Sequence, residues 1–349
     1  MMLGLALGDT VGAARGKLPA RGPLPAGVST QLACFTAEGV IRAAVRLSHR
    51  GICHPPGVVL HAYCRWAALQ GIEVERMRRR WAAGSGGMWP DGWLADVPVL
   101  AERRGSAPAT VTTLSRIEGK DEPTATASRG SHALTRSLPI AVAGDRWAME
   151  AGRFAALTHG DAGAQSATVQ GVVLAHHCLT NSPSGRDPQD SSHRLVRSAL
   201  EAGIAALASS QGAVAVGHEQ LLAAFRQAVD QPVNAASLAR LAPDATTPSA
   251  LLGGLYAAAA FPGRAHLRTA LEFAAGAPDG SSVACVTGAL LGAVHGVGAL
   301  PTDLVSRHEL AWVIDTLARD MVSEIVDSPS GSDHVPGWDP HWRSRYPGW

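Results

Sequence analysis

The sequence predicts an all-α protein built as a single helical domain over residues 1–326. Helical spacing of apolar residues recurs throughout the chain, whereas the strict alternation that is typical of strands is scarce. Hydrophobic residues make up 46% of the 349 residues but aromatic residues only 5%. The core must therefore consist mainly of Ala, Leu and Val, whose small side chains suit close packing of helix on helix. The sequence contains no internal repeat and no linker between two compositions, so one domain is expected.

Turn-forming residues separate the segments that carry the helical pattern. In chain order these segments are 29–49, 57–70, 146–158, 163–180, 194–209, 218–229, 249–260, about 282–297 and 308–326. Polar and proline-rich text predicts a loop at 181–188 and a long connection over 230–248. Residues 327–349 are rich in Ser, Gly, Pro and Trp, which predicts an irregular tail that either docks on the body or stays loosely ordered.

Composition narrows the classes of function. Thirty Lys and Arg residues against 29 Asp and Glu residues give a net charge of +1, which argues against nucleic-acid binding. The five cysteines are scattered and form no Cys-x-x-Cys pair, so neither a disulfide framework nor a zinc site is expected. The apolar segment 283–300 is rich in Gly and Ala and is expected to be a core helix rather than a membrane span. Without a basic segment ahead of the first apolar run, we expect a cytoplasmic protein.

Five blocks of sequence occur in an order that resembles the ADP-ribosylglycohydrolase (DraG-like) family. They are Gly-Leu-Ala-Leu-Gly-Asp-Thr-Val-Gly at 4–12, Gly-Val-Ser-Thr-Gln and Phe-Thr-Ala-Glu-Gly within 27–39, Ser-Arg-Gly-Ser-His at 128–132, Leu-Thr-His-Gly-Asp at 157–161, and Asp-Gly-Ser-Ser at 279–282. The resemblance covers the chain to about residue 325. It implies a single orthogonal multi-helix bundle of the ADP-ribosylglycohydrolase type.

Two of these blocks depart from the family pattern at the residues that hold a pair of divalent cations in the family. Val28 and Ser29 stand where the family has two adjacent aspartates, and Ser281 stands where it has the carboxylate that bridges both cations. Asp279 keeps the first carboxylate of that block, and Ser282 keeps a hydroxyl. Mg²⁺ and Mn²⁺ prefer oxygen ligands, and carboxylates offset their charge. The sequence therefore predicts no metal centre and no other cofactor, and the serines, with Thr30, are expected to be helix N-caps.

The resemblance also implies the positions that contact a ligand. Ser128, Gly130 and Ser131 match a loop that contacts the phosphate and ribose part of the ligand, with a plain turn before a helix as the alternative. His159 matches a histidine that faces the ligand pocket, although a histidine at a helix end is also favoured by the helix dipole. The full set of expected substrate-binding residues is Ser29, Thr30, Ser128, Gly130, Ser131, His159, Asp161, Ser281 and Ser282. Asp161 is also expected to cap the following helix, and Asp9 to be a local cap or an acceptor behind the site.

Three functions remain open from the sequence. The first is a degenerate family member that has lost the metals and binds ADP-ribose or a related nucleotide. The second is an enzyme that acts on an N-glycosidic bond without the family metals, with Asp279 as the candidate catalytic acid or base, or with His159 or Asp161 in that role. The third is a structural protein that binds a protein partner through the tail over residues 338–349. The first is the leading hypothesis, with a small molecule rather than a nucleic acid or a membrane as the partner.

Overall fold

Helices carry the architecture of the protein. The computed structural model describes residues 1–82, 86–117, 125–181, 192–210 and 217–348, and in these residues extended pairing is limited to four isolated bridges. The long helices are α1 (Met2–Ala13), α2 (Val28–Arg50), α3 (Pro55–Leu69), α9 (Ala162–Thr180), α10 (Ser192–Ser209), α11 (His218–Asp230), α13 (Thr247–Ala260), α15 (Gly280–His295) and α17 (Ala311–Asp327). The prediction of an all-α fold is confirmed.

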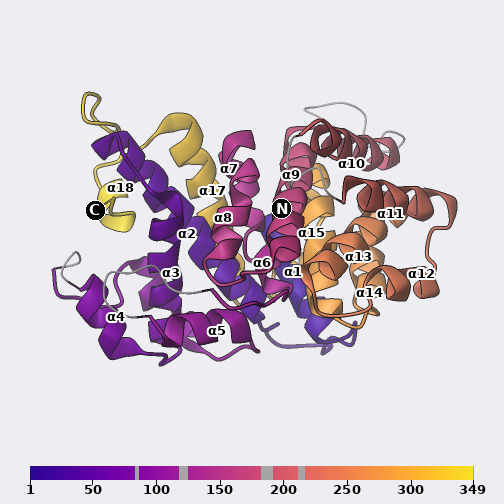
Figure 1. Ribbon diagram of the computed structural model, residues 1–349, viewed down its shortest axis with the longest axis horizontal. Coiled ribbons are helices and arrows are strands. Elements are labelled where there is room, and N and C mark those ends of the chain that lie inside the picture. Colours follow the sequence, from indigo (N-terminus) through magenta and orange to yellow (C-terminus); the bar gives the residue numbers. More distant parts are fainter. Residues whose placement is uncertain (83–85, 118–124, 182–191, 211–216, 349) are drawn as a thin grey trace.

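Shorter helices connect these elements. They are α4 (Val74–Trp81), α5 (Pro108–Ser115), α6 (His132–Thr135), α7 (Asp145–Met149), α8 (Ala151–Ala156), α12 (Ala235–Leu241), α14 (Leu267–Ala274), α16 (Thr302–Val305) and α18 (Trp342–Arg345). Single turns of 3-10 helix occur at Trp93–Asp96, Pro98–Ala101, Leu138–Ala143, Arg264–His266 and Val297–Ala299. Figure 1 shows α2 to α5 with α17 and α18 on one side of the molecule and α10 to α14 on the other.

The close crossing of α1 and α15 lies between these two groups of helices (Figure 1). Gly4 and Gly8 of α1 approach the backbone carbonyls of Gly288 and Ala284 of α15 so closely that a Cβ on either α1 glycine would overlap them. Small residues spaced by four lie on one face of a helix, which lets the two backbones meet. The crossing also brings Asp9, which follows Gly8, to the first turn of α15.

Four ionised side chains form a buried ion cluster between α2, α3 and the segment that follows α4. Arg42 donates from Nε to Glu38 at 2.9 Å and from a terminal nitrogen to Asp91 at 2.8 Å, and Arg65 pairs with Glu38. All four are at most 7% exposed. Two positive and two negative charges balance one another, as burial of ionised groups requires.

The helix boundaries confirm most of the sequence predictions and correct three. The predicted connection over 230–248 contains α12, which Asn234 caps by accepting from Ser237 N. The predicted helix over 146–158 is divided at Glu150 into α7 and α8. Helices α4, α5, α14, α16 and α18 were not predicted. The loop expected at 181–188 lies, beyond Asn181, outside the described residues.

The C-terminal tail packs on the helical body and includes the short helix α18. Trp342 and Tyr346 are buried, and Tyr346 donates from its hydroxyl to Asp320 of α17 at 2.5 Å. Ser330 bridges two helices, because its carbonyl lies 3.0 Å from Nε2 of His49 and its hydroxyl donates to Glu324. Of the two states left open for the tail, docking is the one observed. Among the described helices, none has the length and apolar character needed to cross a bilayer.

Candidate functional site

Asp9 of α1 lies at the first turn of α2 and the first turn of α15. Its Oδ2 accepts hydrogen bonds from the backbone N–H of Thr30 at 2.9 Å and from the Thr30 hydroxyl at 2.8 Å. Its Oδ1 accepts from the Ser281 hydroxyl at 2.7 Å. Gly27 makes room for this carboxylate, because a Cβ there would lie 2.6 Å from Cγ of Asp9. Asp9 is 2% exposed, so its negative charge is stabilised by these donors rather than by water.

This arrangement corrects the expectation that Ser29, Thr30, Ser281 and Ser282 are N-caps. Helix α2 begins one residue earlier, at Val28, and its N-cap Gly27 has no side chain to offer. The N–H group of Thr30, in the first turn, would be unsatisfied within the helix. The carboxylate of Asp9, which belongs to α1, accepts from this N–H group. The sequence around Thr30 does not indicate this contact. Helix α15 begins at Gly280, and no side chain caps it in the conventional way.

Asp279 stands at the N-cap position of α15 but points its carboxylate to α6. Its Oδ2 accepts from the Ser131 hydroxyl at 2.8 Å, and Ser131 Oγ in turn accepts from the Ser282 hydroxyl at 2.8 Å. Ser131 and Ser282 are buried, whereas Asp279 and Ser281 are partly exposed. Ser131, supported by Ser282, therefore binds the Asp279 carboxylate from its buried side. A ligand at the exposed side would contact Asp279.

His132 connects α6 to α2 beside this pair. Its Nδ1 lies 3.1 Å from the Ser29 hydroxyl, and Thr135 donates to the same hydroxyl at 3.1 Å. The other ring nitrogen of His132 lies 2.8 Å from the carbonyl of Ser106. Burial lowers the pKa of His132, which favours the neutral imidazole. Ser29 is thus fully engaged by protein groups at 1% exposure.

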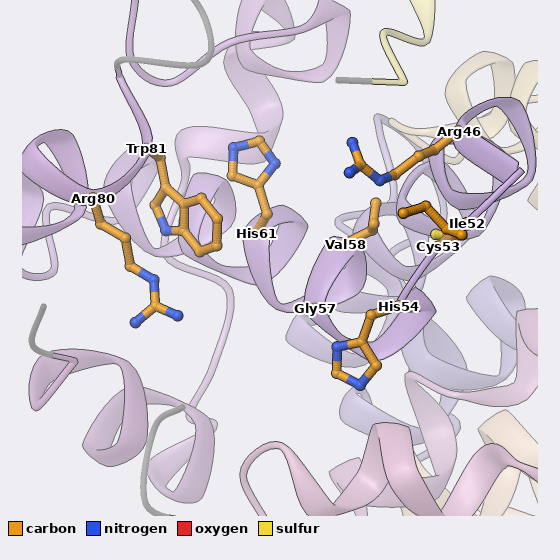
Figure 2. A pocket seen from close by; sticks show the side chains of 9 residues that line it. All are labelled: Arg46, Ile52, Cys53, His54, Gly57, Val58, His61, Arg80 and Trp81. Carbon is orange, nitrogen blue, oxygen red and sulfur yellow. The ribbon is translucent and has the colours of Figure 1, made fainter. Parts of the chain in front are cut away.

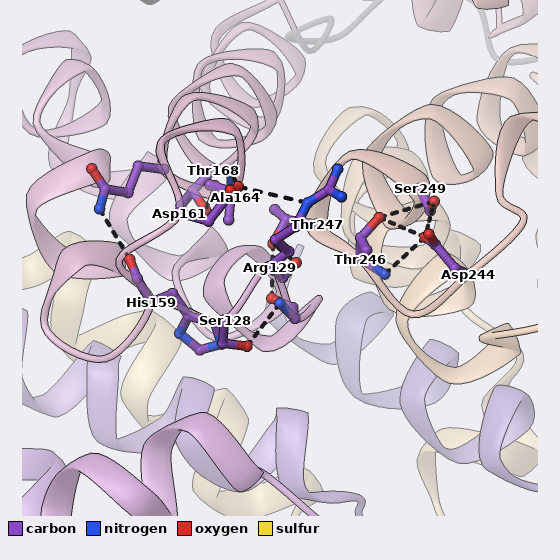
Figure 3. Close-up of polar contacts among 12 residues, drawn as sticks. Ser128, Arg129, His159, Asp161, Ala164, Thr168, Asp244, Thr246, Thr247 and Ser249 are labelled. Carbon is purple, nitrogen blue, oxygen red and sulfur yellow. Dashed lines mark hydrogen bonds and ion pairs between the residues drawn. The ribbon is translucent and has the colours of Figure 1, made fainter. Parts of the chain in front are cut away.

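The loop ahead of α6 lies against His159 (Figure 3). A Cβ on Gly130 would be 3.5 Å from Nε2 of His159, so the two residues are neighbours as the resemblance implies. His159 is 1% exposed, and burial, followed by the charges of Arg136 and His132, lowers its pKa to about 2. A neutral His159 can contribute a hydrogen bond but no charge.

The backbone of this loop is already hydrogen-bonded inside the protein. Gly130 N donates to the Ser128 hydroxyl at 3.1 Å, and Ser131 N donates to the carbonyl of Ala245 at 3.1 Å. These two N–H groups are therefore not directed at an external anion. Arg129, whose side chain is 62% exposed, supplies positive charge on the same loop.

Arg129 lies between two carboxylates. Its Nε is 3.9 Å from Oδ1 of Asp161, and its charge contributes, after hydrogen bonds from Ser249 and Thr246, to lowering the pKa of Asp244 (Figure 3). Asp161 accepts from Ala164 N at 2.8 Å, which confirms that it caps α9. The exposed guanidinium is held near these acids without being enclosed by them.

The residues at the position of the family's metals do not fit a dinuclear centre. Both carboxylates that lie here, Asp9 and Asp279, accept hydrogen bonds from protein hydroxyls. Two divalent cations carry four positive charges, and their sites in proteins rely on several carboxylate oxygens directed at the metal. Within the described parts of the chain, no group of three or more His, Cys, Asp or Glu side chains is arranged to hold a metal ion. We derive no chemistry through a metal here.

The sequence identified most of these neighbours but assigned no role to His132 or Arg129. Ser29, Thr30, Ser131, Asp279, Ser281 and Ser282 lie together, and Ser128, Gly130, His159 and Asp161 lie on the adjoining loop. Asp9 is an acceptor behind the site, which is one of the two roles expected for it, and the α1–α15 crossing brings its donors together. Nothing in the sequence pointed to a role for His132, whereas a charged residue between Ser128 and Gly130 was a usable signal for Arg129.

Comparisons with known proteins agree with this architecture. A family model described as ADP-ribosylglycohydrolase matches residues 1–330. A solved structure titled "ADP-ribosylglycohydrolase-related protein complex" is similar at 23% identity and a TM-score of 0.56, over 93% of this chain and 96% of that chain. At this identity the likeness concerns the fold. None of the curated proteins compared with the chain matches it. Because the family model spans nearly the entire sequence, the protein belongs to the ADP-ribosylglycohydrolase family.

Proposed function

We propose that this protein binds ADP-ribose or a related nucleotide without the dinuclear metal centre of its family. The observation that carries the proposal is the network in which hydroxyl groups of Thr30, Ser131 and Ser281 donate to Asp9 and Asp279. In the family resemblance, cations neutralise the carboxylates at this position. In this chain, hydroxyl and amide groups donate hydrogen bonds to these carboxylates, which stabilises the carboxylates without bound metal.

Charge indicates how such a ligand would lie. A diphosphate placed against Asp9 and Asp279 would be repelled, because no cation stands between the like charges. The hydroxyl groups of a ribose are hydrogen-bond donors and suit the partly exposed carboxylate of Asp279. Arg129 lies two residues before Ser131, which contacts Asp279, and its largely exposed guanidinium is the proposed partner of the phosphates. The proposed orientation is ribose at Asp279 and diphosphate at Arg129.

Isothermal titration calorimetry with ADP-ribose tests this function. The titration is done once in EDTA and once in MnCl₂, and the same protein is assayed for release of ADP-ribose from ADP-ribosylated arginine. We expect saturable binding whose dissociation constant changes by less than about threefold between the two buffers, because no metal takes part. Absence of binding at millimolar ADP-ribose would refute the proposal. Release of ADP-ribose that requires Mn²⁺ would refute the metal-free part of it.

A further inference from the structure

A cavity of about 700 Å³ lies at the opposite end of α2 from the candidate site. It is formed where the end of α2, the segment that leads into α3, and α4 come together (Figure 2). Arg46 in this cavity is 16 residues after Thr30 on the same helix, which corresponds to about 24 Å at 1.5 Å per residue. The cavity is therefore separate from the site around Asp9 and Asp279.

Positive charge and apolar surface meet in this cavity. The described residues that line it include Arg46, Arg80, His54 and His61, and none of these lining residues is a carboxylate; Ile52, Val58 and Trp81 supply apolar surface. Figure 2 shows Arg46 and Arg80 on opposite sides of His61, so the two guanidinium groups belong to different walls. Arg80 also lies over the ring of Trp81, at 4.8 Å from its centroid. Guanidinium groups recognise carboxylates and phosphates by paired hydrogen bonds.

The inner wall of the cavity is aromatic and uncharged. His61 is 1% exposed, and its ring lies between those of Trp81 at 4.7 Å and Trp89 at 5.3 Å. Burial, reinforced by the charges of Arg65 and Arg42, holds the pKa of His61 well below its usual value. The ring is therefore neutral and acts as part of an aromatic surface. Behind it the buried ion cluster contains two cations and two anions, so the charges of the cluster balance one another.

We propose that this cavity binds a small organic anion, namely a phosphate or carboxylate group attached to an aromatic ring. The aromatic wall would take the ring, and Arg46 and Arg80 would take the anionic group. The volume lies within the range of about 300–1,000 Å³ found for pockets that enclose small molecules. A neighbouring cavity of about 240 Å³ shares Cys53 and His54 with it and adds Arg146 together with Arg153 and Glu150, which form an ion pair.

Three naphthalene compounds of similar size test the proposal and separate the two possible anions. These are 1-naphthyl phosphate, 1-naphthoate and the neutral 1-naphthalenemethanol, each titrated into the full-length protein by calorimetry. We expect at least one anion to bind about tenfold more tightly than the alcohol, because each charged contact is worth more than a neutral one. The stronger of the two anions identifies the group that the cavity takes. Equal affinity for all three compounds, or no binding by any of them at millimolar concentration, would overturn the proposal.

Variants of Arg46 on α2 and of Arg80 on α4, with a control on α4, locate the binding. Arg46→Gln and Arg80→Gln are each expected to weaken binding of the preferred anion by about tenfold, and Arg78→Gln is expected to leave it unchanged. Arg78 is two residues from Arg80 on α4, is 56% exposed and does not line the cavity. An equal effect of all three substitutions would indicate nonspecific attraction and contradict the proposal. Circular dichroism confirms that each variant is folded.

Cys53 provides a second readout that does not depend on substitutions. It lines the cavity and is half-buried, whereas the cysteines on the helices, Cys34, Cys64, Cys178 and Cys285, are buried. Modification by N-ethylmaleimide should therefore occur first at Cys53. The preferred anion is expected to slow this modification at concentrations that match its calorimetric affinity. Unchanged modification at saturating anion would place the ligand elsewhere and contradict the proposal.

Discussion

The Ser281 hydroxyl donates a hydrogen bond to Oδ1 of Asp9 at 2.7 Å and thereby joins the first turn of α15 to α1. The family resemblance gives position 281 to a carboxylate that bridges two cations. A serine there reverses the role of the position, because its hydroxyl donates a hydrogen bond to a carboxylate, whereas an aspartate would supply carboxylate oxygens to the cations. The same Asp9 also completes the first turn of α2 by accepting from Thr30 N. A single buried carboxylate thus connects three helices.

Substitution of this carboxylate should destabilise the fold. Asp9→Ala leaves the Thr30 N–H, the Thr30 hydroxyl and the Ser281 hydroxyl without their acceptor in a buried position. We expect the free energy of unfolding in urea to fall by about 3 kcal/mol. Ser281→Ala is the matched control, since it removes one donor from a partly exposed residue and should cost about 1 kcal/mol. Equal effects of the two substitutions would show that Asp9 does not organise the site.

The α1–α15 crossing should not tolerate a methyl group. In Gly8→Ala, the new Cβ would meet the backbone of Ala284, which cannot rotate away as a flexible side chain can. Separation of the helices should cost about 3 kcal/mol and lower the melting temperature. Gly57→Ala on α3 is the control, because there the Cβ would meet only the His54 ring at 3.0 Å and the change should stay within about 1 kcal/mol. A melting temperature of Gly8→Ala equal to that of the wild type would disprove the close crossing.

The contact between the tail and α17 should make stability depend on pH through Glu324. Burial raises the pKa of this carboxyl to about 7 from an ordinary value of 4.5, with Ser330 of the tail as a hydroxyl neighbour. Between these pH values the unfolded chain releases a proton that the folded protein retains. The contribution of Glu324 to the free energy of unfolding therefore falls as the pH rises from about 4.5 to about 7.

Glu324→Gln should remove this dependence, so the difference in melting temperature between variant and wild type should grow in favour of the variant over that range. Buried histidines act in the opposite direction in both proteins, because their lowered pKa values make acid destabilising. Comparison at each pH cancels their contribution. A constant difference across the range would show that Glu324 titrates normally.

Arg129 should be the main determinant of nucleotide affinity in the candidate site. Arg129→Gln is expected to weaken ADP-ribose by about tenfold in calorimetry, because it removes the charge proposed to meet the diphosphate. Arg153→Gln on α8 is the control, since this arginine is also largely exposed, at 59%, and is paired with Glu150. The orientation proposed here would be wrong if both variants bound ADP-ribose as the wild type does.

Local sequence predicted most of the long helices and most of the residues that lie together in the candidate site, but not shorter helices such as α4, α5 and α14. The apolar period over 29–49 gave α2 within one residue at each end. The prediction failed where prolines were ambiguous. Pro232, Pro243 and Pro248 suggested a connection without a helix. However, α12 begins after its N-cap Asn234, and Pro248 lies in the first turn of α13. Prolines are compatible with a helix start, so their presence alone does not exclude one.

The sequence predicts Asp9 to be a local cap or an acceptor behind the site, but it does not identify the groups that donate to its carboxylate. The residues that satisfy its carboxylate are 21 and 272 positions away in the chain. Their meeting depends on the crossing of α1 with α15 and on the space left by Gly27. The motif comparison leaves one carboxylate, Asp279, at the position of the family's metals. The structure brings a second carboxylate, Asp9, to the same region, where it accepts hydrogen bonds from protein groups.

Titration with Mn²⁺, followed by the electron paramagnetic resonance of the free ion, tests the central claim most directly. The full-length protein at a concentration of hundreds of micromolar is titrated with and without ADP-ribose. The account predicts that the signal of free Mn²⁺ rises in proportion to the Mn²⁺ added, as it does for Asp279→Ala. Uptake of two Mn²⁺ ions per chain that is lost in Asp279→Ala would contradict it.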